Sequence, residues 1–217
     1  MTGTISWINL EPKLVAILRG ITLAEVPDIV AGLLETGFRA IEIPLNSPDP
    51  FRSIEAAVRT AEAIAPGNCL IGAGTVLSVD DVLKVHSAGG NLIVSPNVNP
   101  AVIQASISAG MVSFPGVFTP TEAHLALASG ATGLKFFPAS HLGPEGIGAI
   151  RATLPDQTQI CAVGGVDPSN FAKYRKAGVQ GFGLGSKLYK PSTSVADVFA
   201  GARNAIDAYR NLLRSDL

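Results

Sequence analysis

Short apolar runs alternate with amphipathic stretches along the whole chain. The runs are rich in β-branched residues, recur about every 20 to 30 residues, and lie at 14–20, 40–45, 70–76, 92–97, 112–117, 133–139, 160–166 and 181–186. Most are continuously apolar, as strands of a parallel sheet are when both of their faces are buried. The pattern predicts eight parallel strands.

The stretches between the runs carry helix start and stop signals. Residues 22–37 begin with Thr22 and Glu25 at the spacing of a capping box and end at Gly37, which suits a left-handed C-terminal cap. Similar signals predict helices over 78–89 with Ser78 as cap, over 119–130 with Thr119 or Thr121 as cap, and over 167–178 with Asp167 as cap and Pro168 in the first turn.

The regular repetition of strand and helix favours one architecture. No linker or low-complexity stretch separates the units, so we expect one domain over residues 1–217. Eight βα units in a chain of this length fit an α/β fold of the single (β/α)8 TIM barrel type. A doubly wound open sheet is the alternative, but it rarely needs eight evenly spaced units.

Composition and charge exclude several classes of protein. The chain of 217 residues is 47% hydrophobic and only 15% charged, so it can bury a large core and is not disordered. Its formal net charge of −1 and the absence of a basic stripe argue against nucleic acid as a partner. No long uncharged apolar window and no basic leader occur, which predicts a cytoplasmic protein without a membrane segment or cleaved signal.

Cysteine and histidine give no sign of a metal centre. The two cysteines, Cys69 and Cys161, are far apart and lie beside or inside predicted strands, as small buried hydrophobic residues do. The three histidines are isolated and form no metal-binding pair. We therefore expect neither a metal nor an organic cofactor.

The polar residues of the predicted strands gather where a barrel carries its chemistry. Active sites of such barrels lie at the carboxyl ends of the strands and in the loops that follow. The candidates at these positions are Arg19, Glu42, Thr75, Pro96, Lys135, Gly164, Gly165, Gly185 and Ser186.

Lys135 stands in the apolar segment "GLKFFPAS" (133–140), where a charged ammonium group loses hydration. If Lys135 and Glu42 point into the barrel, they can approach each other, either as a buried ion pair that fixes the fold or as catalytic groups. A lysine pKa of about 10.4 must fall to about 7 to 8 for chemistry at neutral pH. Burial and a nearby Arg19 lower it in that direction, and the neutral amine can then form a Schiff base with a ketone.

Two glycine pairs follow the last two predicted strands. "AVGGV" (162–166) and "GLGSKLY" (183–189) let the backbone approach an anion closely, and the loops after strands 7 and 8 are a frequent phosphate site in barrels. The alternative is that these glycines only make tight turns. Both pairs together favour phosphate binding.

Amine, carboxylate and phosphate site together indicate a class I aldolase that acts on a phosphorylated keto compound without a metal. Glu42 is the candidate for the proton transfers that accompany cleavage of a carbon–carbon bond. Two alternatives stay open: a sugar-phosphate isomerase or epimerase with Glu42 as base, and a non-catalytic sugar-phosphate binding barrel.

The chain resembles the 2-keto-3-deoxy-6-phosphogluconate and 6-phosphogalactonate aldolases along nearly its whole length. The matching segments are "AILRGI", "IEIPLNSP", "IGAGTV", "IVSPN", "PGVFTPTEA", "LKFFPAS", "AVGGV" and "GLGSKLY". The resemblance implies a homotrimer of barrels that cleaves a phosphorylated keto-deoxy sugar acid to pyruvate and D-glyceraldehyde 3-phosphate. It also implies the roles of the matching positions: Lys135 for the Schiff base, Glu42 for proton transfer, Arg19 and Thr75 for the pyruvate end, and Gly165, Gly185 and Ser186 for the phosphate.

Asn46 bears on the subtype. Gluconate-type members resemble "E-x-T-L-R-T" at the second strand, whereas "EIPLNSP" places Asn46 where they carry arginine, as galactonate-type members do. "HLGP" is also closer to the galactonate type, while "PGVFTPTEA" is closer to the gluconate type. The resemblance therefore favours the galactonate substrate, with the gluconate epimer as a further substrate or as the alternative specificity.

Overall fold

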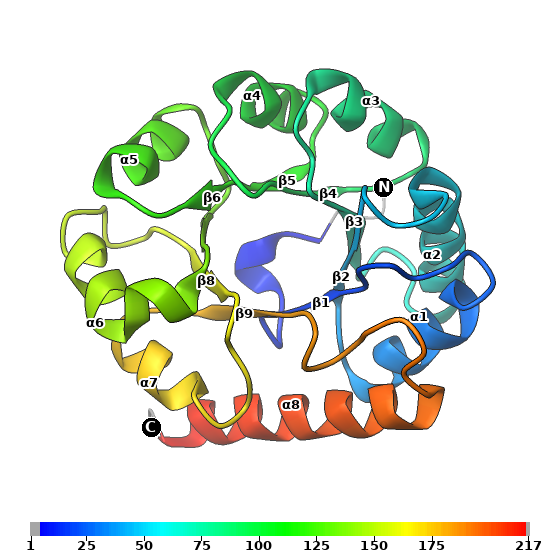
Figure 1. Cartoon of the computed structure of the whole chain (residues 1–217). Coiled ribbons are helices and arrows are strands. Elements are labelled where there is room, and N and C mark those ends of the chain that lie inside the picture. Colours follow the sequence, from blue (N-terminus) through cyan, green and yellow to red (C-terminus); the bar gives the residue numbers. More distant parts are fainter. Residues whose placement is uncertain (1–4, 216–217) are drawn as a thin grey trace.

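The structure is a computed structural model that describes residues 5–215; residues 1–4 and 216–217, the ends of the expected domain, lie outside the described residues. Within them, nine parallel strands form a ring with eight α-helices around it (Figure 1). That residues 1–217 form one domain stays a prediction. The strands are β1 (Leu14–Ile17), β2 (Ala40–Pro44), β3 (Leu70–Gly74), β4 (Leu92–Val94), β5 (Val112–Phe114), β6 (Gly116–Val117), β7 (Leu134–Phe136), β8 (Ile160–Val163) and β9 (Gly181–Leu184).

The ninth strand arises because one predicted strand is split. β5 and β6 both come from the run 112–117, and β5 pairs with β4 whereas β6 pairs with β7. Proline cannot donate to a ladder, so the strand bends at Pro115, although the Pro115 carbonyl accepts a hydrogen bond from the Lys135 N–H at 3.0 Å. The bent strand joins both ends of the sheet. This confirms the barrel and rules out the doubly wound open sheet.

The helices lie between successive strands on the outside of the ring. They are α1 (Val26–Thr36), α2 (Pro50–Ile64), α3 (Val79–Ser87), α4 (Pro100–Ser108), α5 (Pro120–Ala128), α6 (Ala139–Arg151), α7 (Phe171–Lys176) and α8 (Val195–Ser215). Three predicted ends are confirmed. Ser78 accepts a hydrogen bond from the Asp81 N–H, Thr119 and Glu122 form a complete capping box, and Gly37 has a left-handed φ of 111°.

Two predicted helix starts are wrong. α7 begins at Phe171, because the side chain of the expected cap, Asp167, accepts hydrogen bonds from the N–H and hydroxyl of Ser169 and closes a turn instead. The Glu25 carboxylate accepts hydrogen bonds from the N–H and hydroxyl of Thr22, but α1 starts only after Glu25. In both places the side-chain contact forms one turn ahead of the helix.

Strand alternation divides the core into two parts. One large cluster fills the space between strands and helices and includes Leu14, Ala16 and Ile41. A second cluster lies inside the ring and includes Val15 and Ala40. Side chains at every second position of a strand point to the same face. Ile17, two positions after Val15, and Glu42, two positions after Ala40, therefore also point into the ring.

The barrel interior is closed at its amino-terminal end. The short 3₁₀ helix η1 (Trp7–Asn9) lies there, as Figure 1 shows for the blue segment inside the ring, and Trp7 and Leu10 are buried in the inner cluster. The Trp7 ring meets Phe114 edge-on with 4.6 Å between ring centroids. Chemistry is therefore confined to the opposite end. No helix within residues 5–215 is long and apolar enough to cross a membrane.

Candidate active site

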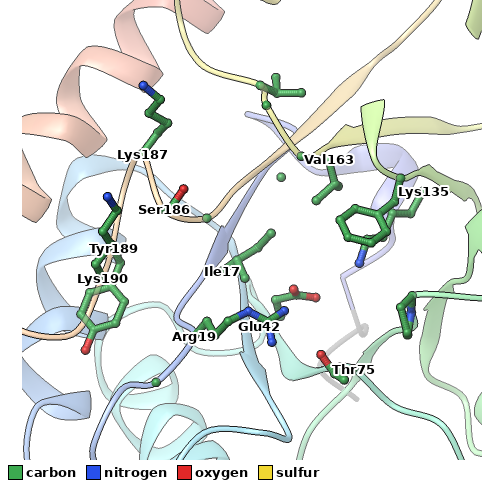
Figure 2. A pocket seen from close by; sticks show the side chains of 18 of the residues that line it. Ile17, Arg19, Glu42, Thr75, Lys135, Val163, Ser186, Lys187, Tyr189 and Lys190 are labelled. Carbon is green, nitrogen blue, oxygen red and sulfur yellow. The ribbon is translucent and has the colours of Figure 1, made fainter. Parts of the chain in front are cut away.

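A cavity of about 670 Å³ opens at the carboxyl ends of the strands. Figure 2 shows its labelled side chains coming from β1, β2, β7 and β8 and from the loops after β1, β3 and β9. Nine of the ten expected site residues line it: Arg19, Glu42, Thr75, Pro96, Lys135, Gly164, Gly165, Gly185 and Ser186. Asn46 does not. Several strands end earlier than expected, so the loops rather than the strands hold Arg19, Thr75, Pro96, Gly164, Gly165 and Gly185.

Lys135 points into the barrel from the middle of β7. Its neighbours in sequence, Leu134 and Phe136, belong to the outer cluster, so strand alternation turns Lys135 inward. Only 7% of the residue is exposed, and its Nζ lies 4.8 Å from the centroid of the Phe137 ring. Burial and then the charge of Arg19 lower the pKa of Lys135, and the charge of Glu42 opposes them.

Glu42 points inward from β2 with 2% of the residue exposed. Its Oε2 is buried and has no hydrogen-bond partner among residues 5–215. Gly74 leaves the space that this carboxylate occupies, because a Cβ at Gly74 would lie 2.7 Å from Oε1 of Glu42. Burial raises the pKa of Glu42 despite the charges of Lys135 and Arg19, so the carboxyl group can hold a proton closer to neutral pH.

Lys135 and Glu42 face the same cavity without forming a salt bridge. The salt bridges found among residues 5–215 join Lys13 to Glu11, Arg59 to Glu55 and Lys84 to Asp80. A structural ion pair between Lys135 and Glu42 is therefore not the reason for their burial. Both groups are instead available to a molecule in the cavity.

Arg19 and Asn46 connect two neighbouring loops. Nη1 of Arg19 donates a hydrogen bond to Oδ1 of Asn46 at 2.5 Å, and the Gly20 N–H donates to Oγ of Ser47 at 2.9 Å. The loops after β1 and β2 are thereby held together at the mouth. Asn46 does not line the cavity itself but contacts Arg19, which does, so a direct contact of Asn46 with a substrate stays a prediction.

Thr75 follows β3 in a conformation that sequence patterns do not reveal. Its φ is 58°, in the left-handed region that β-branched residues rarely adopt. Such strain persists only where surrounding contacts enforce it and is common in binding sites. The Val76 N–H, next in the chain, donates to the Val94 carbonyl and so fixes this loop beside Pro96.

The two glycine loops differ in what their glycines provide. Gly164 and Gly165 have φ of 92° and 75°, and a Cβ at Gly165 would lie 2.5 Å from Cβ of Ser140. A Cβ at Gly185 would meet nothing within 4 Å, and the adjacent Ser186 is exposed to the cavity. The loops therefore present neutral N–H and hydroxyl donors around an open space, which suits an anion.

Several lining residues were not anticipated from the sequence. The cavity is also lined by Phe137 and, as Figure 2 shows, by Val163, Lys187, Tyr189 and Lys190. The signal for the last three was the run "SKLYK" directly after the predicted phosphate loop. Residues 5–215 contain no group of three or more His, Cys, Asp or Glu side chains that could hold a metal ion.

Comparison with known proteins gives matches over nearly the whole chain. The family described as "Aldolase: KDPG and KHG aldolase" matches residues 5–200. A probable 2-dehydro-3-deoxy-6-phosphogalactonate aldolase of Rhizobium meliloti is 58% identical over 92% of this chain and 92% of its own length. The 2-dehydro-3-deoxy-6-phosphogalactonate aldolase of Escherichia coli is 44% identical over 93% of this chain and 96% of its own length.

Solved structures agree with these relatives. A structure described as native KDPGal has a TM-score of 0.92 at 42% identity and covers 97% of this chain and 100% of its own. A protein cage designed by fusing symmetric oligomeric domains has a TM-score of 0.91 at 42% identity, covering 95% of this chain and 75% of its own. The match spans the strands and loops that form the cavity. This chain therefore belongs to the KDPG and KHG aldolase family and is a carbon–carbon lyase.

Proposed function

We propose that this aldolase cleaves 2-dehydro-3-deoxy-6-phosphogalactonate to pyruvate and D-glyceraldehyde 3-phosphate through a Schiff base on Lys135. The observation that carries the proposal is the Lys135 amine: it is buried, opens into the cavity and has no salt-bridge partner among the described residues. Its lowered pKa increases the share of neutral amine at neutral pH, and only the neutral amine attacks a ketone.

The reaction then follows from ordinary imine chemistry. The Lys135 nitrogen adds to C2 of the substrate, and loss of water leaves a protonated imine. Removal of the proton from the C4 hydroxyl breaks the C3–C4 bond, and its electron pair moves into the imine to give an enamine. The aldehyde product leaves, C3 takes up a proton, and water hydrolyses the resulting imine to release pyruvate. The scheme uses no metal and no organic cofactor.

Glu42 is proposed to carry both of these protons. As a carboxylate it accepts the C4 hydroxyl proton, and as a carboxylic acid it returns a proton to C3. The raised pKa of Glu42 suits a group that must exist in both forms near neutral pH. Because Oε2 of Glu42 has no hydrogen-bond partner within the part of the chain that the structure describes, it can take part without breaking a hydrogen bond there.

The two ends of the substrate are proposed to bind on different loops. Arg19, Thr75 and Pro96 lie after β1, β3 and β4 and are suited to the carboxylate end, with Arg19 as the cation. The phosphate is proposed to bind at the loops after β8 and β9, through N–H groups around Gly164, Gly165 and Gly185 and the hydroxyl of Ser186. Asn46 is proposed to act by holding Arg19.

Borohydride trapping with pyruvate tests the proposal. Intact-mass analysis should show a covalent adduct on the wild type and none on Lys135→Ala. Lys187→Ala, which removes another lysine from the same cavity, is the matched control and should still be trapped. An isomerase or a binding barrel forms no reducible imine, so equal mass gains in wild type and Lys135→Ala, or no gain in either, would exclude the aldolase mechanism proposed here.

The galactonate substrate is supported by the names of the two relatives reported above and by Asn46. Asparagine offers a shorter, neutral amide in place of the charged guanidinium group of arginine. Discrimination between the C4 epimers is therefore proposed to rest on single hydrogen bonds worth about 0.5–1.5 kcal/mol each. We expect a few-fold to about tenfold higher kcat/KM on the galactonate epimer. A large preference for the gluconate epimer would contradict this proposal and would favour the gluconate-type specificity that the segment "PGVFTPTEA" indicates.

A homotrimer is also proposed. Exposed large hydrophobic side chains gather on the neighbouring helices α3, α4 and α5 and the loops before them (Figure 1): Leu77, Val79, Leu83, Ile107, Phe118 and Leu125. The designed cage that resembles this chain is built from symmetric oligomeric domains. Light scattering should give a trimer mass for the wild type and for Ile64→Glu on α2, and a smaller mass for Leu83→Glu. A monomeric wild type would contradict the trimer.

A cytoplasmic location is proposed from the substrate and the cysteines. Phosphorylated sugar acids are charged metabolites, and Cys69 and Cys161 are both free and buried, as in a reducing compartment. Cell fractionation with activity measurement tests this proposal, and activity in an extracytoplasmic fraction would contradict it.

A further inference from the structure

The cavity is lined by more basic than acidic residues. Five of its lining residues are charged types, and only Glu42 among them is acidic; the basic residues are Arg19, Lys135, Lys187 and Lys190. The whole chain has a formal net charge of −1, so the positive character belongs to this cleft and not to the protein. Clefts lined by one sign of charge raise the local concentration of ligands of the opposite sign.

Lys187 and Lys190 stand apart from the groups that carry the proposed chemistry. Both lie in the segment after β9, together with Ser186 and Tyr189, on the side of the cavity away from Lys135 (Figure 2). Both are exposed to solvent, whereas Lys135 is buried. This segment is rigid at its start, since the N–H groups of Leu188 and Tyr189 both donate to the Gly185 carbonyl, at 2.8 and 2.9 Å.

The neutral donors of the proposed phosphate site need charged neighbours. N–H groups and one hydroxyl orient a phosphate, but they carry no formal charge to balance a dianion. Lys187 follows Ser186 directly, and Lys190 is three residues further on. The hydrogen bonds that Oδ1 of Asp167 accepts from Ser169, and to a smaller extent the charge of Lys187, lower the pKa of Asp167. Among residues 5–215 no salt bridge joins Lys187 to Asp167, and Asp167 does not line the cavity. Lys187 is therefore available to an anion in the cavity.

We propose that Lys187 and Lys190 form a cationic rim that attracts the phosphate group and sets the preference for phosphorylated over unphosphorylated substrates. The inference rests on the proposed function and goes beyond it, since it assigns charge recognition to two side chains outside the reacting centre. Together with Arg19, the rim supplies three cations, matching a substrate with one carboxylate and one phosphate dianion. Neither lysine is a catalytic residue.

Substitution of both lysines by glutamine tests the inference. We expect KM for the phosphorylated substrate to rise about threefold to tenfold for Lys187→Gln or Lys190→Gln, and more in the double variant, while kcat stays near wild type. The kcat/KM for the unphosphorylated keto-deoxy sugar acid should not change. The ratio of kcat/KM for the phosphorylated substrate to kcat/KM for the unphosphorylated one should therefore fall. Lys187→Arg, which keeps the charge, should restore most of the loss, and Lys176→Gln on α7, an exposed lysine outside the cavity, should behave as wild type.

Two further measurements, the dependence of kcat/KM on salt and the inhibition by inorganic phosphate, would not change if the two lysines had only a structural role. Wild-type kcat/KM should fall as KCl is raised, because exposed charges are screened over about 10 Å at 0.1 M salt, and the double variant should show a flatter dependence. Inorganic phosphate, used as a competing ligand, should inhibit the double variant more weakly, with pyruvate trapping unchanged. Equal phosphate inhibition and equal salt dependence in wild type and double variant would overturn the inference.

The same measurements separate this inference from the proposed aldolase reaction. Failure of pyruvate trapping at Lys135 would remove the proposed function, whereas inorganic phosphate binding measured by calorimetry does not depend on turnover. Weaker phosphate binding by the double variant than by Lys176→Gln supports the cationic rim in either case.

Discussion

The substitution Gly74→Ala should displace the Glu42 carboxylate without unfolding the barrel. The three atoms nearest to a Cβ at Gly74 all belong to that carboxylate, at 2.7, 2.8 and 3.0 Å, whereas ordinary contacts begin at 3.4 Å. The carboxylate must therefore move by roughly half an ångström or more, and it can do so because it is the far end of a flexible side chain. A misplacement of about 1 Å costs about 100-fold in rate, so we expect kcat to fall about 10- to 100-fold.

The assay combines turnover, trapping and stability. The free energy of unfolding of Gly74→Ala should stay within about 1 kcal/mol of the wild type, because the φ of Gly74 is not positive and alanine lowers the entropy of the unfolded chain. Pyruvate trapping on Lys135 should persist. Gly148→Ala on α6 is the matched control, since its Cβ would lie 3.8 Å from Ala177, an ordinary contact far from the cavity, and its kcat should not change.

Two results would refute this reasoning. A kcat of Gly74→Ala within about twofold of the wild type would mean that the position of the Glu42 carboxylate does not limit turnover. A parallel loss of turnover, trapping and thermal stability would mean that the substitution damages the barrel as a whole.

Four further outcomes are expected. Glu42→Gln should keep imine formation but lower kcat by about 10²- to 10⁴-fold, and a kcat within about threefold of wild type would assign the protons to another group. Gly165→Val should raise KM for the phosphorylated substrate, because its side chain would meet Ser140, while pyruvate trapping is largely spared; equal losses would indicate misfolding. Because burial raises the pKa of Glu42, the wild type should lose stability as the pH rises above 4.5. Glu42→Gln should therefore be thermally more stable than the wild type at about pH 7 but not at about pH 4, and the opposite trend would contradict the argument from burial. Thr119→Ala should lower the free energy of unfolding by about 1 kcal/mol through loss of the capping box, with kcat unchanged; an unaltered denaturation midpoint would show that the cap contributes nothing.

The architecture could be predicted because its signals are local. Apolar runs, caps such as Ser78 and the C-terminal Gly37 depend on neighbouring residues, and these predictions are confirmed. The bend at Pro115 could not be predicted, because it depends on which strands the two halves of the run 112–117 pair with. The direction of Lys135 was equally undetermined, since a strand that is apolar on both faces gives no alternation to show which face is inside.

The residues that line the cavity were predictable one by one, but the contacts among them were not. The positions at strand ends fall on the cavity because all the parallel strands end at the same side of the barrel. The contact between Arg19 and Asn46 joins residues 27 positions apart in the chain, and the left-handed φ of Thr75 arises from its surroundings. Such features depend on how loops meet in space, which sequence spacing does not encode.

In the proposed mechanism, the burial of Lys135 and Glu42 prepares both groups for the transfer of protons. Burial lowers the pKa of the lysine and raises the pKa of the glutamate, so both groups are pushed toward their neutral forms. Arg19 acts on both pKa values in one direction, lowering each of them: it favours the neutral amine and opposes the protonated carboxyl group. In the proposed mechanism, Arg19 thus favours the reactive neutral form of the Lys135 amine while helping the Glu42 carboxyl group to release its proton. Because the hydrogen bond from Arg19 to Asn46 holds that cation at the mouth, we expect Asn46, in the loop after β2, to influence the pKa values of both groups through Arg19.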